Sequence, residues 1–520
     1  MCMTKDRLLW ADDEMDLLKP HILFLEEKGY EVVTTTNGQD ALDLCREQSF
    51  DLVFLDENMP GLSGLETLNA IKEILPSLPV VMITKNEEED IMDQAIGRKI
   101  ADYLIKPVNP GQMWLTIKKI VHKEEIIHDA TTTSFRQNFL KLSQQISDAD
   151  SCESWKEVYK KIVHWELELE QTGTGMDDML KQQKAEANRL FSRFIRNNYL
   201  HWMDHPEDRP MMSPDLFKDK VFPLLDAGEK VFFILIDNFR FDQWQVIKRL
   251  LGDQFNMEES LYFSLLPTAT QYARNSVFSG LMPVQIQKMF PELWVDEDEE
   301  EGKNLNESPL IQTQLDRFRK KYGFTYHKIN DNLAGEKLMA KVKEVLNTPL
   351  NVVVFNFIDM LSHARTESKM IRELAGTEAA YRSLTESWYK HSAISEMFRY
   401  LVEQDVKIIL TTDHGCIHVD NPVKMVGDRN TNTNLRYKVG KNLNYDPKQV
   451  FEIKNPEKHG LPSPNMSSTY IFATNNDFFA YPNNYNYYAS HYKDTFQHGG
   501  ISMEEILIPF ITLEPKKKPQ

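Results

Sequence analysis

The stretch FDLVFLDENMPG at residues 50–61 decides the fold of the first part of the chain. Its apolar run Leu52–Leu55 is typical of a buried strand, and Asp56 stands where that strand ends. Similar runs alternate with helical patterns on both sides, which predicts a doubly wound, five-stranded parallel α/β sheet over residues 1–122. The other strands are Arg7–Ala11, Glu31–Thr35, Val80–Thr84 and Tyr103–Ile105, and the helices lie near 15–28, 38–47, 64–74, 88–98 and 110–122.

Polar residues suited to phosphoryl transfer stand at the ends of these strands. Asp12 and Asp13 follow the first strand, Asp56 ends the third, Thr84 ends the fourth and Lys106 follows the fifth. Because ligands of such sheets bind at the carboxyl ends of the strands, the carboxylates can converge on one Mg²⁺ ion. The ion would neutralise a phosphoryl donor, so that the Asp56 carboxylate can attack phosphorus. The hydroxyl and the ammonium would hold the phosphoryl oxygens.

This set, with the string LDENMPG and the pair Lys106-Pro107, resembles the receiver domain of response regulators. The resemblance covers about the first 122 residues and implies phosphorylation of Asp56 by a histidine kinase. It also implies a homodimer that forms after phosphorylation through a face within residues 87–120. The implied roles are Mg²⁺ binding by Asp12, Asp13, Asp56 and the backbone of Asn58, a switch pair of Thr84 and Tyr103, and the family's lysine contact from Lys106.

Two further segments follow. Residues 123–208 show apolar residues at helical spacing and no strand pattern, which predicts a small helical-bundle connector. From 209 to 515 strands and helices alternate again, which predicts a large α/β domain with an inserted cap near 421–465 and an acidic loop at Asp296–Glu301. The expected strands are Lys230–Asp237, Val352–Phe357, Lys407–Thr412, Ser468–Ala473 and 506–513, with long helices such as 367–403 between them.

Three Asp and three His of this last domain stand near strand ends or loops. Asp359 and His363 are four residues apart, so one helical turn places both on one face. Mixed Asp and His ligation suits Zn²⁺ and also Mn²⁺, and two neighbouring ions would stabilise the attacking and leaving oxygens of phosphoryl transfer. The other four are Asp237, Asp413, His414 and His498.

A threonine hydroxyl in the string LLPTATQYARNSVFSG is the candidate nucleophile. A metal ion on its oxygen would lower its pKa enough for attack at neutral pH. Thr270 and Thr268 are both candidates, and spacing alone does not choose between them.

The order Asp, Thr, Asp-x-x-x-His, Asp-His and His-Gly resembles the alkaline phosphatase superfamily, and within it the PglZ branch. In related phosphodiesterases the nucleophile lies ten residues before a glycine, as Thr270 lies before Gly280, which favours Thr270 over Thr268. The resemblance implies two Zn²⁺ ions. One would be held by Asp359, His363 and His498, and the other by Asp237, Asp413, His414 and Thr270.

A receiver, a helical connector and a PglZ domain in one chain resemble the PorX-type response regulators linked to type IX secretion. That resemblance implies a zinc-dependent phosphodiesterase acting on cyclic and linear oligonucleotides, and a sigma factor as a further partner. Asn238 and Asn275 are candidate donors to a substrate oxygen. Arg436 and Lys438 of the insertion are candidate contacts to a polyanion, although the segment is equally well an ordinary solvated loop.

Other functions stay open. The chain can instead be a transcriptional or scaffold regulator whose metal-bound domain binds a sigma factor or secretion protein without turnover. The net charge of −18 is unfavourable for broad contact with nucleic acid. No apolar run reaches the roughly 18 residues of a membrane span, and the first residues lack a signal peptide pattern. We therefore expect a cytoplasmic protein without membrane insertion.

Overall fold

The computed structural model describes most of the 520 residues. The helix predicted near 88–98 and most of the acidic stretch Asp296–Glu301 lie outside the described residues. The chain forms two compact units, one of residues 1–134 with 172–174 and one of residues 135–171 with 175–520. Described are residues 5–85, 100–173, 175–296, 304–367, 369–427, 431–465 and 467–516.

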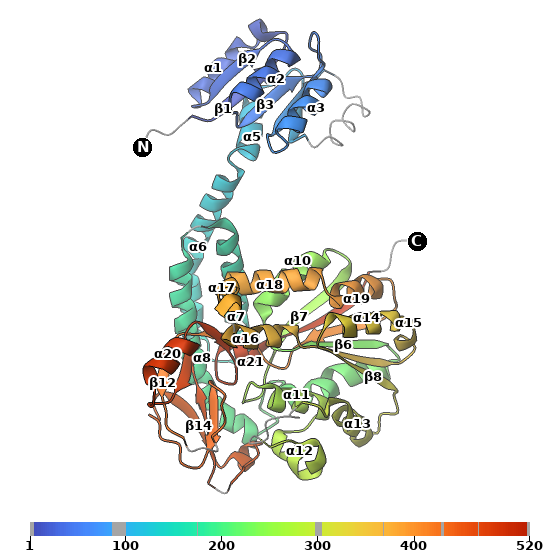
Figure 1. Ribbon diagram of the computed structural model, residues 1–520, viewed down its shortest axis with the longest axis vertical. Helices are drawn as coiled ribbons and strands as arrows, with labels where there is room; N and C mark the ends of the chain where they lie inside the picture. The colour runs from blue at the N-terminus through green and yellow to red at the C-terminus, as the bar shows by residue number, and fades with distance from the viewer. Residues whose placement is uncertain are drawn as a thin grey trace. The chain divides into compact units, whose positions relative to one another are not determined.

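The first unit contains the predicted parallel sheet, in the order β2-β1-β3-β4-β5 (Figure 1). Separate apolar clusters cover the two faces of the sheet, which explains why β3 is buried along its whole length. The strand order reverses between β1 and β3, and ligands of doubly wound sheets bind at that point. The elements are β1 Arg7–Ala11, β2 Glu31–Thr35, β3 Leu52–Asp56, β4 Val80–Thr84, β5 Asp102–Ile105, α1 Lys19–Glu27, α2 Gly38–Glu47, α3 Gly64–Ile74 and α5 Pro110–Ile120.

Three long helices form the connector: α6 Lys123–Asp148, α7 Cys152–Thr172 and α8 Asp177–Asp204. Their apolar faces do not close on a core of their own. Instead Trp155 of α7 and Phe191 of α8 belong to the apolar cluster that also contains the strands of the C-terminal domain. The connector, which we predicted as a separate bundle, is therefore built into the second unit from residue 135 onward.

A six-stranded sheet in the order β7-β18-β10-β6-β9-β8 forms the centre of the second unit. Strands β10, β6, β9 and β8 are parallel, whereas β18 and β7 are antiparallel additions at one edge. Helices α10, α18 and α19 cover one face and α11 and α13 the other (Figure 1). The strands are β6 Val231–Ile236, β7 Phe255–Phe263, β8 Phe324–Ile329, β9 Leu350–Phe355, β10 Lys407–Thr411 and β18 Leu507–Pro515.

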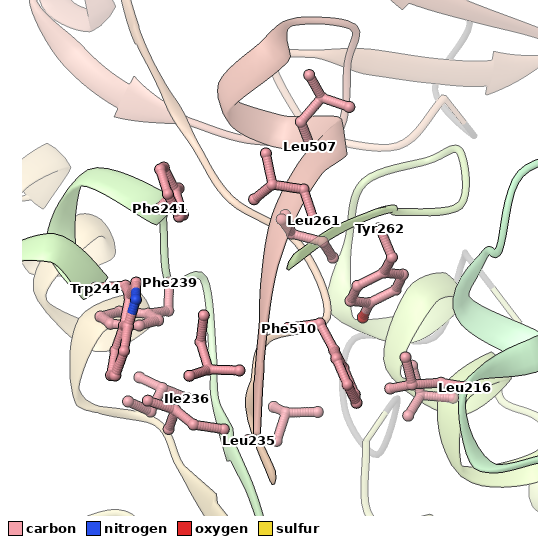
Figure 2. Packing of buried hydrophobic residues seen from close by; sticks show 14 of the residues in the cluster. Leu216, Leu235, Ile236, Phe239, Phe241, Trp244, Leu261, Tyr262, Leu507 and Phe510 are labelled. Carbon is pink, nitrogen blue, oxygen red and sulfur yellow. The ribbon is translucent and has the colours of Figure 1, made fainter. Parts of the chain in front are cut away.

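The core of this sheet is continuous on both faces. Every residue of β6 is buried, as expected for a central strand covered by helices on both sides. Figure 2 shows Trp244 and Phe239 on one side of β18, and Phe510 and Leu216 on the other.

The helices between β9 and β10 differ from the sequence prediction. The long helix expected over 367–403 is divided, and Thr377 caps a new helix by accepting a hydrogen bond from the backbone N–H of Ala380. The helices of this domain are α9 Phe222–Asp226, α10 Phe241–Leu251, α11 Thr270–Ser279, α12 Pro283–Met289, α13 Glu307–Arg317, α14 Asn332–Ala340, α15 Val342–Val345, α16 Phe357–Glu367, α17 Lys369–Leu374, α18 Glu378–Lys390, α19 Ala393–Leu401, α20 Tyr485–Tyr492 and α21 Met503–Ile506.

The inserted segment is a small β structure that extends beyond the predicted end near 465. Its three-stranded sheet has the order β13-β15-β14, and β12 pairs with β16, so the insertion reaches Ala480. Among the helices that the structure describes, none has the length and apolar character that crossing a membrane requires. The strands are β11 Ile417–Val419, β12 Asn421–Lys424, β13 Tyr437–Gly440, β14 Val450–Lys454, β15 Thr469–Ala473, β16 Asp477–Ala480 and β17 Thr495–Gln497.

Candidate functional site

The receiver unit brings its three predicted carboxylates together. Asp12, Asp13 and Asp56 each offer an oxygen within 4.8 Å of the others. The Nζ of Lys106 lies 2.8 Å from both Asp12 Oδ2 and Asp56 Oδ1, so its ammonium bridges two of them. Burial raises the pKa of the Asp56 carboxyl, and Lys106 only partly offsets this. Oxygen ligands that converge in this way suit a hard cation such as Mg²⁺.

The other predicted receiver residues lie around this group. Thr84 is buried at the end of β4, and its hydroxyl donates a hydrogen bond to Glu57. Tyr103 on β5 is substantially exposed, and Asn58 is exposed in the loop after β3. The predicted switch pair therefore has one buried and one exposed member in this structure.

A buried group forms where β6 and β10 end. Asp237 directly follows β6, and Asp413 and His414 follow β10, which is the neighbouring strand. Their ligand atoms lie within 4.8 Å of one another, and all three side chains are buried. The Nδ1 of His414 lies 3.2 Å from the carbonyl oxygen of Gly415, which leaves Nε2 to face the carboxylates.

A second group adjoins the first and is more open. Asp359 and His363 lie one turn apart on α16, and His498 directly follows β17. His498 stacks on His414 with ring centroids 4.3 Å apart, while the side chain of His363 is 63% exposed. The His498 Nδ1 lies 3.0 Å from the carbonyl oxygen of Thr268, so Nε2 faces Asp359. The site therefore opens to solvent on the side of α16.

The structure distinguishes the two candidate nucleophiles. The Oγ1 of Thr270 lies 3.2 Å from His414 Nε2 and 3.5 Å from Asp237 Oδ1, at the first residue of α11. The Thr268 hydroxyl instead donates to the carbonyl oxygen of Gly500 and accepts from the N–H of Gly499. Thr270 is therefore the threonine whose oxygen faces the buried group.

The pKa values of the two carboxyl groups in the buried group are shifted in opposite directions. Burial raises the pKa of Asp237 well above its usual value, although the Arg274 guanidinium opposes this. Burial also acts to raise the pKa of Asp413, but Arg274 and His414 outweigh it and hold that pKa below its usual value. Burial, together with His414, lowers the pKa of His498 to about 3, so its imidazole is neutral. A neutral imidazole is the form that binds a metal ion.

Sequence reasoning missed Arg274. This fully buried guanidinium contacts Asp237, donates from Nε to Asp413 Oδ2 at 2.9 Å, and lies 3.2 Å from Glu307 Oε1 through its Nη1. The one available signal was its position four residues after Thr270, which places both on one face of α11.

Two predicted substrate contacts have structural roles instead. Arg436 is fully buried, pairs with Glu505 at 2.6 Å and donates to backbone carbonyl oxygens. Lys438 is buried too, and its ammonium donates to the carbonyl oxygen of Asn432. Neither side chain reaches solvent, so the prediction that they contact a polyanion is wrong.

Asn238 and Asn275, the two candidate donors to a substrate oxygen, have different surroundings in the structure. The Asn238 Nδ2 donates to Asp359 Oδ1 at 3.2 Å and to Ser362 Oγ at 3.1 Å, so it orients a carboxylate of the open group. Its buried Oδ1 has no hydrogen-bond partner among the described residues. Asn275 is buried on α11, and its role as a substrate contact stays a prediction.

The donor set fits a pair of divalent metal ions. Each group offers carboxylate oxygens and at least one imidazole Nε2, and carbonyl oxygens hold two imidazoles by the opposite nitrogen. The two groups adjoin where His414 of the buried group stacks on His498 of the open group. A two-metal phosphoryl-transfer site needs such neighbouring ligand groups beside a nucleophile.

Comparisons with known families cover the chain in three successive parts. The response regulator receiver domain model matches residues 8–118, and the PorX response regulator linker domain model matches residues 125–203. The model of the BREX system PglZ alkaline phosphatase-like domain matches residues 216–513, which is more than half of the chain.

Individual relatives match the receiver part. The alkaline phosphatase synthesis transcriptional regulatory protein PhoP of Bacillus subtilis is 30% identical over 122 residues, which are 23% of this chain and 50% of that protein. The alginate biosynthesis transcriptional regulatory protein AlgB of Pseudomonas syringae is 36% identical over 22% of this chain and 26% of its own length. The chain thus spans half or less of these two relatives.

A solved response regulator receiver domain from Clostridium thermocellum is 30% identical, with a TM-score of 0.22, and covers 23% of this chain and 98% of its own. The receiver sheet, the helical connector and the C-terminal α/β domain follow one another in the order in which the three family models match the chain. The chain is a PorX-type response regulator, and its output domain belongs to the PglZ family of alkaline phosphatase-like domains.

Proposed function

We propose that this response regulator hydrolyses phosphodiesters with two Zn²⁺ ions bound by its PglZ domain. The observation that carries the proposal is the position of Thr270, whose hydroxyl faces the buried group at the first residue of α11. Helix N-termini favour negative charge, so the start of α11 also stabilises an oxyanion at Thr270. When bound, the two ions would lower the pKa of this hydroxyl and stabilise the leaving oxygen.

In this proposal, residues of the chain position the metal ligands, line the substrate entrance and supply the nucleophile. Arg274 holds the Asp237 and Asp413 carboxylates in place, and Asn238 orients Asp359. The exposed side of α16, which carries His363, is where a phosphodiester enters. The Oγ1 of Thr270 attacks phosphorus from the buried side as the ester bond from phosphorus to the leaving oxygen breaks, and that oxygen takes up a proton to leave as an alcohol. Water then cleaves the bond between Oγ1 and phosphorus, which releases the phosphate monoester and restores the Thr270 hydroxyl.

The remaining parts of the proposal extend the family assignment. The receiver domain implies phosphorylation by a sensor kinase. We propose a histidine kinase as the donor, Mg²⁺ bound by Asp12, Asp13 and Asp56, and a homodimer that forms on phosphorylation. Cyclic or linear oligonucleotides are the proposed substrates, type IX secretion the regulated process, a sigma factor a further partner, and the cytoplasm the location.

A hydrolysis screen tests the enzyme. Purified protein is loaded with Zn²⁺ or treated with a chelator, and assayed on chromogenic phosphate monoesters, chromogenic phosphodiesters and short oligonucleotides. We expect Zn²⁺-dependent release from the diesters that exceeds release from monoesters. A protein that binds Zn²⁺ at the PglZ domain but hydrolyses none of these substrates would favour the scaffold function instead.

A further inference from the structure

A chain of ion pairs, buried at its inner end and partly exposed at its outer end, joins the connector to the loops of the candidate site. We call it the Arg240 network, and its members are Arg240, Asp242, Glu378, Arg382 and Glu170. The Nη2 of Arg240 lies 2.6 Å from Asp242 and 2.5 Å from Glu378. The Arg382 Nη1 lies 2.9 Å from the same Asp242 carboxylate, and its Nε donates to Glu170 of α7 at 3.0 Å.

At its inner end the network touches the loops that carry the metal-ligand candidates. Arg240 lies three residues after Asp237, and its Nη1 donates to the carbonyl oxygen of Cys416 in the loop after His414. Its guanidinium also lies 5.2 Å from the ring centre of Phe496, two residues before His498. Arg240 therefore belongs to one of the chain segments that supply the two ligand groups and contacts two others.

The backbone at Gly415, next to Arg240, is packed closely against its surroundings. A Cβ at Gly415 would lie 2.0 Å from the carbonyl oxygen of Glu504 and 3.3 Å from Arg240 Cγ. Both arginines use several nitrogens on carboxylates, and such fork contacts fix direction as well as distance.

Stability alone is a poor explanation for such a network. Burying an ion pair costs desolvation that its attraction often only balances, so apolar residues would serve as well. Burial acts to raise the pKa of Glu378, but the Arg240 guanidinium outweighs it and holds that pKa well below its usual value, so Glu378 stays charged. Directional charged contacts are what the network adds to ordinary packing.

At its outer end the network reaches the last turn of helix α7 in the connector. Glu170 is the third residue from the end of α7, and its side chain is 35% exposed. A change in the last turn of α7 would therefore act on Arg382 first.

We propose that Arg240 is a positioning residue for both ligand groups, and that its network couples their geometry to helix α7 of the connector. The coupling to metal binding rests on the proposed function, whereas the coupling to loop geometry does not. The network gives the connector a direct route to the catalytic loops, through side chains that take no part in the reaction.

The test compares two glutamates of the same helix in the full chain. Glu170→Gln removes the outer carboxylate, and Glu168→Gln is the matched control, because Glu168 is 38% exposed and faces Arg249 at 4.0 Å outside the network. The first measurement is amide hydrogen exchange without metal in segments 237–243, 413–417 and 495–498. We expect Glu170→Gln to speed exchange there by about fivefold or more, and Glu168→Gln to leave it unchanged.

Zn²⁺ affinity, measured by competition with a chromogenic chelator, is the second readout. We expect Glu170→Gln to weaken it by about tenfold, since residues behind metal ligands commonly have effects of that size. Arg382→Gln and the double variant Glu170→Gln/Arg382→Gln are measured as well. The double variant should bind Zn²⁺ no more weakly than the weaker binder of the two single variants. Unchanged exchange in all three segments, even with a lower melting temperature, would overturn the proposal. If the wild-type chain binds no Zn²⁺, the proposed function fails, and the exchange data still decide the coupling.

Discussion

Arg274 Nε donates a hydrogen bond to Asp413 Oδ2 at 2.9 Å in a place where neither side chain reaches solvent. The same guanidinium contacts Asp237 and Glu307, so one cation compensates three buried carboxylates. Two of those three carboxylates are proposed metal ligands. If the proposed metal ion binds there, it and Arg274 would together neutralise the negative charge of these carboxylates.

Replacing Arg274 with Met should destabilise the chain strongly. Removing one partner of a buried ion pair costs about 3–5 kcal/mol, because it leaves uncompensated charge. We expect that loss of unfolding free energy in urea with a chelator present, and a smaller loss with Zn²⁺. An equal loss under both conditions would contradict a shared role. Lys320→Met, which removes a surface pair with Asp226, is the control and should change little.

Thr270→Val should abolish diester hydrolysis and preserve the fold, because the side chain loses only the hydroxyl that faces His414. Zn²⁺ affinity should fall only modestly, since three other ligands remain in that group. The measurement is turnover of a chromogenic diester beside Zn²⁺ titration. Thr268→Val is the control, and it should lose about 1 kcal/mol of stability but keep turnover. Retained hydrolysis by Thr270→Val would exclude it as the nucleophile.

Asp56→Asn should abolish phosphorylation of the receiver domain, because the amide cannot form the acyl phosphate. Intact mass after incubation with Mg²⁺ and a small phosphoryl donor checks this. Asp51→Asn is a matched control, because Asp51 is exposed just before the same strand and accepts a hydrogen bond from the backbone of Arg7. A phosphorylated Asp56→Asn protein would place the acceptor elsewhere.

His498 should make the metal-free protein less stable as the pH falls. Its folded-state pKa of about 3 lies below the usual 6.5, so below pH 6.5 the unfolded chain takes up a proton that the folded chain does not. The unfolding free energy should therefore fall as the pH drops below 6.5. The slope of that decrease should approach about 1.4 kcal/mol per pH unit. His498→Gln should lack this component. Chelator-treated samples of both proteins, unfolded in urea from pH 7.5 to 5, provide the comparison, and parallel curves would refute it.

The sequence predicted the receiver strands well, because short apolar runs alternate there with clear helical patterns. The proximity of Asp237 and Asp413 was predictable because parallel strands bring their carboxyl ends to one edge of the sheet. The edge strands β7 and β8 were missed, because the predicted strands were the strongly apolar runs, and Phe255–Phe263 and Phe324–Ile329 carry many polar residues.

Buried charge was the least predictable feature. Arg436 stands in a stretch rich in Asn and Lys that resembles a solvated loop, yet its partner Glu505 lies 69 residues away in the sequence. The partners of Arg240 and Arg274 are similarly distant, apart from Asp242. Local patterns contain no information about such pairs, since only the folded topology brings the charges together.

Gly415 follows the pair Asp413 and His414, and a methyl group there would collide with the backbone of Glu504. The glycine in this string is therefore required by space and not by reaction chemistry. In a related chain, a larger residue at this position would require the loop to lie farther from the backbone of Glu504. Inspection of that single position can thus show, from sequence alone, which relatives hold the Asp413 and His414 segment in a different place.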